Sequence, residues 1–232
     1  MPYLEDLRRR LYHGVVLFVV SFVIGFLFAG VILKKVLSFV HIEDVTIAAS
    51  SPFQYITVAM NAGFFTAIIF STPYIMYSIY TFVRPALTRN EKIWFLKSVP
   101  LSIGLFLVGF TYGFFILYYA LELFAAINLG LGIANIWNIS QFISEIFITS
   151  SLLGFIFEFP LLLTLLIKLG ITTPQTLKNN RRIAYFSSLC VSALLPPADV
   201  LSLLAMALPL VILYEVTILL NNRKNYVWIR NY

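Results

Sequence analysis

The sequence predicts an all-α integral membrane protein with six transmembrane helices, of which the fifth and sixth are short, and with both termini in the cytoplasm. Of its 232 residues, 60% are hydrophobic and only 11% are charged, and the mean hydropathy is +0.92. Soluble domains carry about 25% charged residues. The apolar residues gather in long stretches, and the basic residues fall between them in a regular order. A soluble cytosolic enzyme and a disordered chain are therefore excluded.

Five apolar stretches are long enough to cross a hydrocarbon layer of about 30 Å as helices. They cover residues 11–33, 53–83, 94–121, 139–167 and 200–220. The first has 23 residues, more than the roughly 7–15 of a secretory signal's apolar core. We therefore expect it to be kept as a membrane span.

A sixth crossing is predicted over residues 183–195, although these 13 residues would by length alone suit a re-entrant or buried segment. Basic clusters precede this segment and follow residue 220. If both clusters lie on the same side, the chain between them must cross and return. Pro196 and Pro197 then form the turn, because two prolines cannot continue a helix. The whole chain, residues 1–232, is expected to be one membrane domain.

The positions of the cations predict the orientation. With both ends inside, 14 of the 16 Lys and Arg residues lie on the inner side, where positive residues prefer to be. These are Arg8, Arg9, Arg10, Arg84, Arg89, Lys92, Lys97, Lys168, Lys178, Arg181, Arg182, Arg223, Lys224 and Arg230. Only Lys34 and Lys35 lie outside. The net charge of +6 thus belongs to a membrane face and does not indicate nucleic-acid binding.

The residues required for catalysis are scarce. The only histidines are His13 and His41, the single cysteine is Cys190, and no HExxH or GxSxG motif is present. A nucleophile with a base, or a cluster of metal ligands, is therefore not apparent. We expect no enzyme activity, no metal and no cofactor.

One acidic residue stands near the middle of a span. Glu158 lies ten residues before Lys168, or about 15 Å deep at helical rise, and Pro160 cannot donate a hydrogen bond to the carbonyl of Ile156. Because an ionised acid at this depth is costly, we expect Glu158 to be neutral or hydrogen-bonded. An acid in a broken helix also occurs in transporters, so an ion-coupled carrier of a small molecule is the alternative function.

Short motifs follow one another in order along the chain. They are residues 4–11 (LEDLRRRL), 51–53 (SPF), 82–87 (FVRPAL) with Glu91-Lys92, 154–160 (GFIFEFP), 170–174 (GITTP), and 196–200 (PPADV) with 207–209 (ALP) and 213–215 (LYE). Together they resemble the TatC family, the multi-span receptor subunit of the twin-arginine protein translocase. The resemblance departs at Asp6, where the family has Glu, and at Leu153, where it has Phe.

The resemblance implies six helices with cytoplasmic termini in a bacterial or archaeal cell membrane, or an organellar equivalent. The implied ligands are twin-arginine signal peptides of folded cargo proteins. Small single-span subunits of the TatA and TatB type, further copies of the receptor and membrane lipid are the implied partners, and the proton motive force is the implied energy source.

By the same resemblance, two cytoplasmic acids, Asp6 and Glu91, are expected to accept the arginines of the signal peptide. The signal-peptide site is completed by Arg8, Arg10, Phe82 and Pro85. Two structural interpretations stay open. Asp6 is also spaced for an i,i+4 pair with Arg10, and Glu91 also suits the N-terminus of the third helix.

The resemblance further implies an intramembrane polar site for partner helices, with the residues Glu158, Pro160 and Asp199. A carboxyl bonded only to a neighbouring helix is the alternative for Glu158. Gly109 and Gly113 form a GxxxG pattern in the third span, which fits either a partner helix or internal packing.

Overall fold

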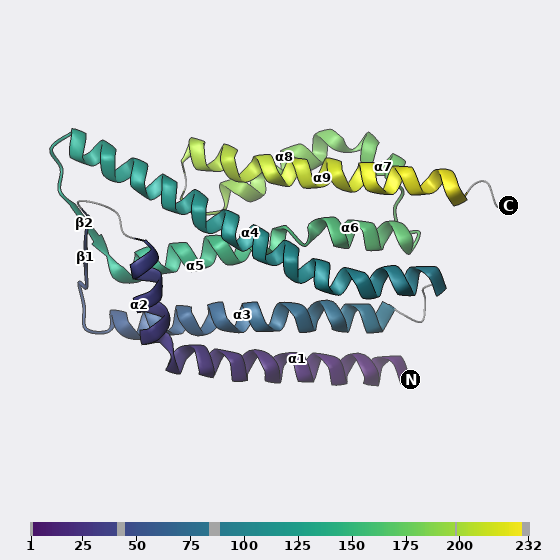
Figure 1. The fold of residues 1–232 in the computed structure, drawn as a ribbon, viewed down its shortest axis with the longest axis horizontal. Coiled ribbons are helices and arrows are strands. Elements are labelled where there is room, and N and C mark those ends of the chain that lie inside the picture. The colour runs from purple at the N-terminus through teal and green to yellow at the C-terminus, as the bar shows by residue number, and fades with distance from the viewer. Residues whose placement is uncertain (1, 41–44, 84–88, 198, 229–232) are drawn as a thin grey trace.

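The computed structural model of the chain describes residues 2–40, 45–83, 89–197 and 199–228. The elements in chain order are α1 (Pro2–Leu27), α2 (Ala29–Phe39), β1 (Val45–Ala48), α3 (Gln54–Val83), α4 (Arg89–Gly130), β2 (Asn135–Asn138), α5 (Ile139–Ile156), α6 (Phe159–Lys168), α7 (Pro174–Asn179), α8 (Arg181–Ala193) and α9 (Val200–Trp228). The long helices lie side by side along one axis. The beginning of α1 and the end of α9 lie at one end of the molecule, and α2, β1 and β2 lie at the other (Figure 1).

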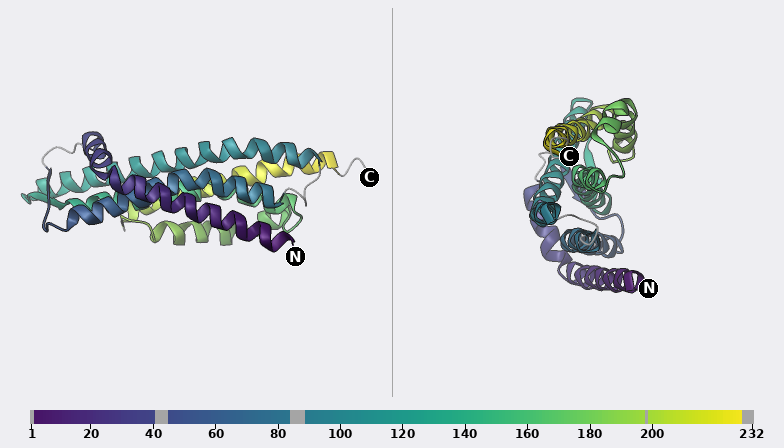
Figure 2. Two further views of the ribbon diagram at one scale, coloured as in Figure 1. Left: turned by 90° about the horizontal axis from the view of Figure 1, so that it is seen from below. Right: turned by 90° about the vertical axis from the view of Figure 1, so that its right-hand side faces the viewer.

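The helices form a curved row. Seen end-on, α1 lies at one edge next to α3, and α8 lies with α9 at the other edge (Figure 2). Between them, α5 packs against both α3 and α4, and α6 packs against α9. Among the described helices, α3 is the neighbour of α1 along most of its length, and much of the surface of α1 is exposed.

The predicted class, an α-helical membrane protein, is confirmed. Within the described ranges, five helical segments are long and apolar enough to cross a membrane, namely Arg8–Leu27, Gln54–Ile79, Ser98–Gly130, Ile139–Lys168 and Val200–Asn222. The sixth expected span corresponds to α8, which has 13 residues and a length of about 20 Å at helical rise. Its crossing therefore stays a proposal.

The structure divides the first apolar stretch, for which one helix over residues 11–33 was expected. Helix α1 ends at Leu27, and α2 runs in a different direction from Ala29 (Figure 1). The reason is amphipathicity, because Ile32, Leu33 and Val36 pack against the core while Lys34 and Lys35 are exposed. The stretch is thus a span followed by a surface helix.

Two short strands were not expected in an all-α chain. The strands β1 and β2 are parallel, and Val45 pairs with Asn135 at one end of the register and Ala48 with Asn138 at the other. Helix α4, with 42 residues, extends past the expected end at residue 121 and carries the chain to this pairing. The pair connects the segment after α2 to the segment before α5.

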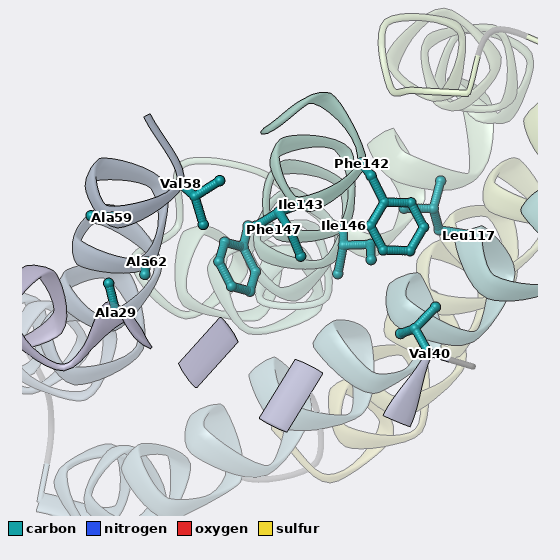
Figure 3. Packing of buried hydrophobic residues seen from close by; sticks show 10 residues of the cluster. All are labelled: Ala29, Val40, Val58, Ala59, Ala62, Leu117, Phe142, Ile143, Ile146 and Phe147. Carbon is teal, nitrogen blue, oxygen red and sulfur yellow. The ribbon is translucent and has the colours of Figure 1, made fainter. Parts of the chain in front are cut away.

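The largest buried cluster joins α2, α3, α4 and α5. Figure 3 shows Ile143, Ile146 and Phe147 of α5 between small residues of α3 and Leu117 of α4. The rings of Phe65 and Phe147 are stacked, with centroids 4.5 Å apart. This core holds α5 in place, and therefore positions the residues that follow it.

The GxxxG pattern is used for internal packing of α4 on α5. A Cβ atom at Gly109 would lie 2.6 Å from Cγ of Phe157 and 2.7 Å from the carbonyl oxygen of Leu153. A Cβ atom at Gly113 would lie 3.0 Å from Cα of Ser150. Of the two interpretations of this pattern, the structure thus has the internal one.

We expect Gly109→Ala to lower the thermal stability of the protein. The added methyl group would displace a backbone carbonyl and a ring, and overpacking of this kind costs about 1–3 kcal/mol. Gly104→Ala is the matched control, because Gly104 lies on the same helix and its Cβ would meet nothing within 4 Å. Thermal scans by circular dichroism in one detergent compare the two variants. Equal melting temperatures of the two variants would contradict the close contact of Gly109 with Leu153 and Phe157.

Candidate functional site

Glu158 lies at a break in the fourth expected span. Helix α5 ends at Ile156 and α6 begins at Phe159, so the predicted effect of Pro160 on the carbonyl of Ile156 is observed as an interruption of the helix. The amides of Leu161 and Leu162 donate to the carbonyl oxygen of Glu158 at 3.0 and 3.2 Å. Glu158 is therefore held at the start of a new helix in the middle of the bundle.

The side chain of Glu158 is buried, with 4% of its surface exposed, and is directed at α4. The hydroxyl Oγ of Ser102, itself fully buried, donates to Oε1 of Glu158 at 2.8 Å. Among the described residues, the second oxygen, Oε2, is buried and has no hydrogen-bond partner. An acceptor left in this state is costly to the fold. The carboxyl is thus only partly satisfied by its own chain.

Asp199 lies at the turn between α8 and α9. Its Oδ1 accepts a hydrogen bond from the amide of Ser202 at 2.8 Å, so it caps the beginning of α9. The hydroxyl of Thr149 on α5 donates to the carbonyl of Pro196 at 2.8 Å and fastens this turn to α5. Thr149 precedes Glu158 by nine residues, or about 14 Å at helical rise. Glu158 and Pro160 thus lie together at the break between α5 and α6, whereas Asp199 belongs to a turn that is fastened to α5 about 14 Å further along the bundle.

The expected signal-peptide residues come from three helix ends. Asp6 is near the beginning of α1, Phe82 is near the end of α3, and Glu91 is in the first turn of α4, and these helix ends lie at the same end of the bundle (Figure 1). The side chains of these three residues, and all of Pro85, lie outside the described part of the chain.

The two expected arginines of this group are described. Arg8 is exposed and Arg10 is half-buried. The hydroxyl of Tyr74 on α3 donates to the carbonyl of Arg10 at 3.2 Å. This bond joins the beginning of α1 to α3, the helix that leads to Phe82.

A further polar cluster at this end, formed by Glu215, Arg181 and Tyr185, was not predicted from the sequence. Glu215 on α9 accepts from Nη2 of Arg181 at 2.6 Å and from the hydroxyl of Tyr185 at 2.5 Å. Arg181 and Tyr185 are four residues apart on α8 and so share one face. The hydroxyl of Tyr214 donates to the carbonyl of Leu177 at 2.8 Å. These bonds join α7, α8 and α9 to one another.

Within the described ranges, no group of three or more His, Cys, Asp or Glu side chains is placed to hold a metal ion. The polar groups described above are single carboxyls with hydroxyl, amide or guanidinium donors. Among the described residues, these groups bind one another across helices. The fold thus defines a multi-pass α-helical membrane protein.

The comparisons with known proteins identify the family. The family model for the Sec-independent protein translocase protein (TatC) matches residues 2–209. The chain therefore belongs to the TatC family, whose members are translocase components and not enzymes. Membership implies partnership with other Tat subunits and residence in the cell membrane as a multi-pass protein.

Individual relatives agree over nearly the full length. The chain is 31% identical over 222 residues to the Sec-independent protein translocase protein TatCy of Bacillus subtilis (strain 168), with 95% of this chain and 87% of the relative covered. It is 34% identical over 228 residues to TatC of Helicobacter pylori (strain ATCC 700392 / 26695), with 97% and 87% covered.

Two crystal structures share the fold. The first, described as the twin arginine translocase receptor TatC, has a TM-score of 0.74, 30% identity, and coverage of 95% of this chain and 98% of that chain. The second, of the same receptor in DDM, has a TM-score of 0.78 and 29% identity, with 94% and 99% covered.

Proposed function

We propose that this chain is the core receptor of a twin-arginine translocase, which binds twin-arginine signal peptides at its cytoplasmic face and scaffolds export of folded proteins. The observation that carries the proposal is the convergence of three helix ends, of α1, α3 and α4, at one end of the bundle. These ends contain Asp6 and Glu91 among many cations. A carboxylate accepts the planar fork of an arginine in bidentate fashion.

Glu215, a further acid at this end, is less suited to the signal peptide. Both oxygens of Glu215 already accept hydrogen bonds, from Arg181 and from Tyr185. Engaging a ligand would require breaking these bonds. Asp6 and Glu91 are therefore the acids that we assign to the two arginines.

The proposal includes one membrane domain over residues 1–232, six crossings and cytoplasmic termini. Two observations support it. The beginning of α1 and the end of α9 lie at the same end of the molecule, and 14 of the 16 cations fall in the segments expected inside. In a Cys190→Ser background, we expect a membrane-impermeant maleimide to label Leu194→Cys in intact cells, and to label Gln175→Cys and Asn222→Cys only after lysis. Equal protection of Leu194→Cys and Gln175→Cys would contradict a crossing by α8.

The proposed partners are twin-arginine signal peptides, small single-span subunits of the TatA and TatB type, further copies of the receptor, and membrane lipid. An apolar groove of about 410 Å³ between α5–α6, α8 and α9 supports a helical partner. Its lining includes Ala184, Ser187 and Ser188 of α8, small residues that let the backbone of a partner helix approach closely. A single apolar helix would lie along such a groove.

The test is complementation. In a strain without its own receptor, this chain and the single-span subunits of its host are expected to restore export of a reporter with a twin-arginine signal. The matched reporter with twin lysines is expected to stay inside, because an ammonium group lacks the bidentate geometry. Failure of export by a chain that is inserted and bound to its partners would contradict the proposal. Substrate-dependent proton flux by the reconstituted chain would favour the alternative function, an ion-coupled carrier of a small molecule.

A further inference from the structure

A second groove, of about 400 Å³, lies between α1 and α3. From α1 it is lined by Arg10, Leu11, Gly14 and Val15, and from α3 by Tyr74 and Ile75 among others. Apart from Arg10, none of these residues belongs to the signal-peptide or partner sites proposed above. The groove is apolar along most of its length and has a cation at one end.

Gly14 and Tyr74 lie against each other in the lining of this groove. A Cβ atom at Gly14 would lie 3.4 Å from the ring of Tyr74, so the ring packs against α1 at the glycine. The hydroxyl of Tyr74 donates to the carbonyl of Arg10, which fixes the ring next to this arginine. The rim is formed by Leu11, which is 62% exposed, and by Val15, which is 61% exposed.

The length of the groove matches one leaflet of the bilayer. From Arg10 to Phe18, which also lines it, the chain rises by eight residues, or about 12 Å. Half of the hydrocarbon layer is about 15 Å thick. With Arg10 at the membrane surface, the apolar part of the groove therefore lies within the hydrocarbon of that leaflet.

Charge and rim shape favour a lipid over a helix. Arg8 and Arg9 are exposed within one turn of Arg10, and basic pockets between membrane helices on the cytoplasmic side suit anionic headgroups. Two helices associate in a membrane where small residues let their backbones approach. Here the exposed rim consists of the bulkier Leu11, Val15 and Ile75, between which a flexible hydrocarbon chain fits.

We propose that this groove binds an anionic phospholipid of the inner leaflet, with an acyl chain along Gly14 and Val15 and the phosphate group at Arg10. The assignment to the inner leaflet rests on the proposed orientation. The binding itself depends only on the groove and its cations.

The test is native mass spectrometry of the purified full chain with equal amounts of phosphatidylglycerol and phosphatidylcholine of the same acyl composition. The wild-type chain is expected to retain phosphatidylglycerol preferentially. Arg10→Gln is expected to weaken this retention about fivefold, which corresponds to about 1 kcal/mol for one arginine at an anionic surface. Arg10→Lys should keep most of the preference. Val15→Trp, which fills the groove, should remove both lipids.

Lys34→Gln is the matched control, because it removes one exposed cation from the opposite end of the molecule. Equal retention of the two lipids by the wild type would overturn the proposal, as would equal effects of Arg10→Gln and Lys34→Gln. Retention of phosphatidylglycerol by Val15→Trp would assign the lipid to the general basic surface. Loss of twin-arginine peptide binding in Val15→Trp with unchanged lipid retention would make the groove a peptide site. Because the assay is independent of export, its failure and that of the proposed function are distinguishable.

Discussion

Export of a twin-arginine reporter is expected to stop when Asp6→Asn and Glu91→Gln are combined. Each substitution keeps the size of the side chain and removes the negative charge that accepts an arginine. Hydrogen bonds to charged groups contribute about 1.5–3 kcal/mol each, so each single variant should bind the signal peptide about tenfold to a hundredfold more weakly. The binding of a fluorescent twin-arginine peptide to the purified variants measures this loss directly.

The control separates binding from a local structural role. Glu5→Gln removes an exposed acid from the same turn of α1 and should leave peptide affinity within about twofold, as expected for most surface substitutions. If Asp6 only paired with Arg10, its substitution would lower the stability of α1 by a few tenths of a kcal/mol and leave peptide affinity nearly unchanged. If Glu91 only stabilised the first turn of α4, its substitution would likewise lower the stability of that helix slightly and leave peptide affinity nearly unchanged. Undiminished export by the inserted double variant would contradict the assignment.

Hydropathy and prolines predicted much of the fold. The lengths of the apolar stretches indicated the long helices, and Pro160 indicated the interruption that separates α5 from α6. The turn at Pro196 and Pro197 is also observed, between Ala193 and Val200. These features depend on local sequence, because a proline acts on its own turn and hydropathy acts over one span.

What the sequence did not predict depends on contacts between distant residues. Ser102 and Glu158 are 56 residues apart, and Arg181 and Glu215 are 34 residues apart. A serine in an apolar helix carries no sign of its partner. The strands β1 and β2 are likewise too short to be recognised without each other.

The end of the first span could have been found. The spacing of Ile32, Leu33 and Val36 around Lys34 and Lys35 is typical of a surface helix. Hydropathy assigns residues 28–33 to the preceding span, because an apolar residue has the same hydropathy whether it faces lipid or a protein core. The direction of α2 only became apparent with its packing against α3.

Glu158→Ala is expected to impair transport far more than assembly. The structure gives a reason to separate the two, because one oxygen of the buried carboxyl has no partner among the described residues. An apolar residue at this position removes the cost of burying the unpartnered oxygen, and this offsets the loss of the acceptor for the hydroxyl of Ser102. Glu158→Met, which fills a similar volume, is therefore expected to melt close to the wild type while export falls at least tenfold.

Ser102→Ala tests whether the orientation of the carboxyl matters. It removes the hydroxyl that donates to Oε1 and leaves the carboxyl in place, so export should fall by less than in Glu158→Ala. Pulse-chase measurements of reporter export, together with copurification of the single-span subunits, distinguish transport from assembly. A normal export rate with stable Glu158→Ala protein would reduce the carboxyl to a structural contact with α4. A stable Glu158→Met protein that retains its partners but exports slowly would instead show that the chain keeps a poorly satisfied acid, at a cost to its own stability, because translocation uses it.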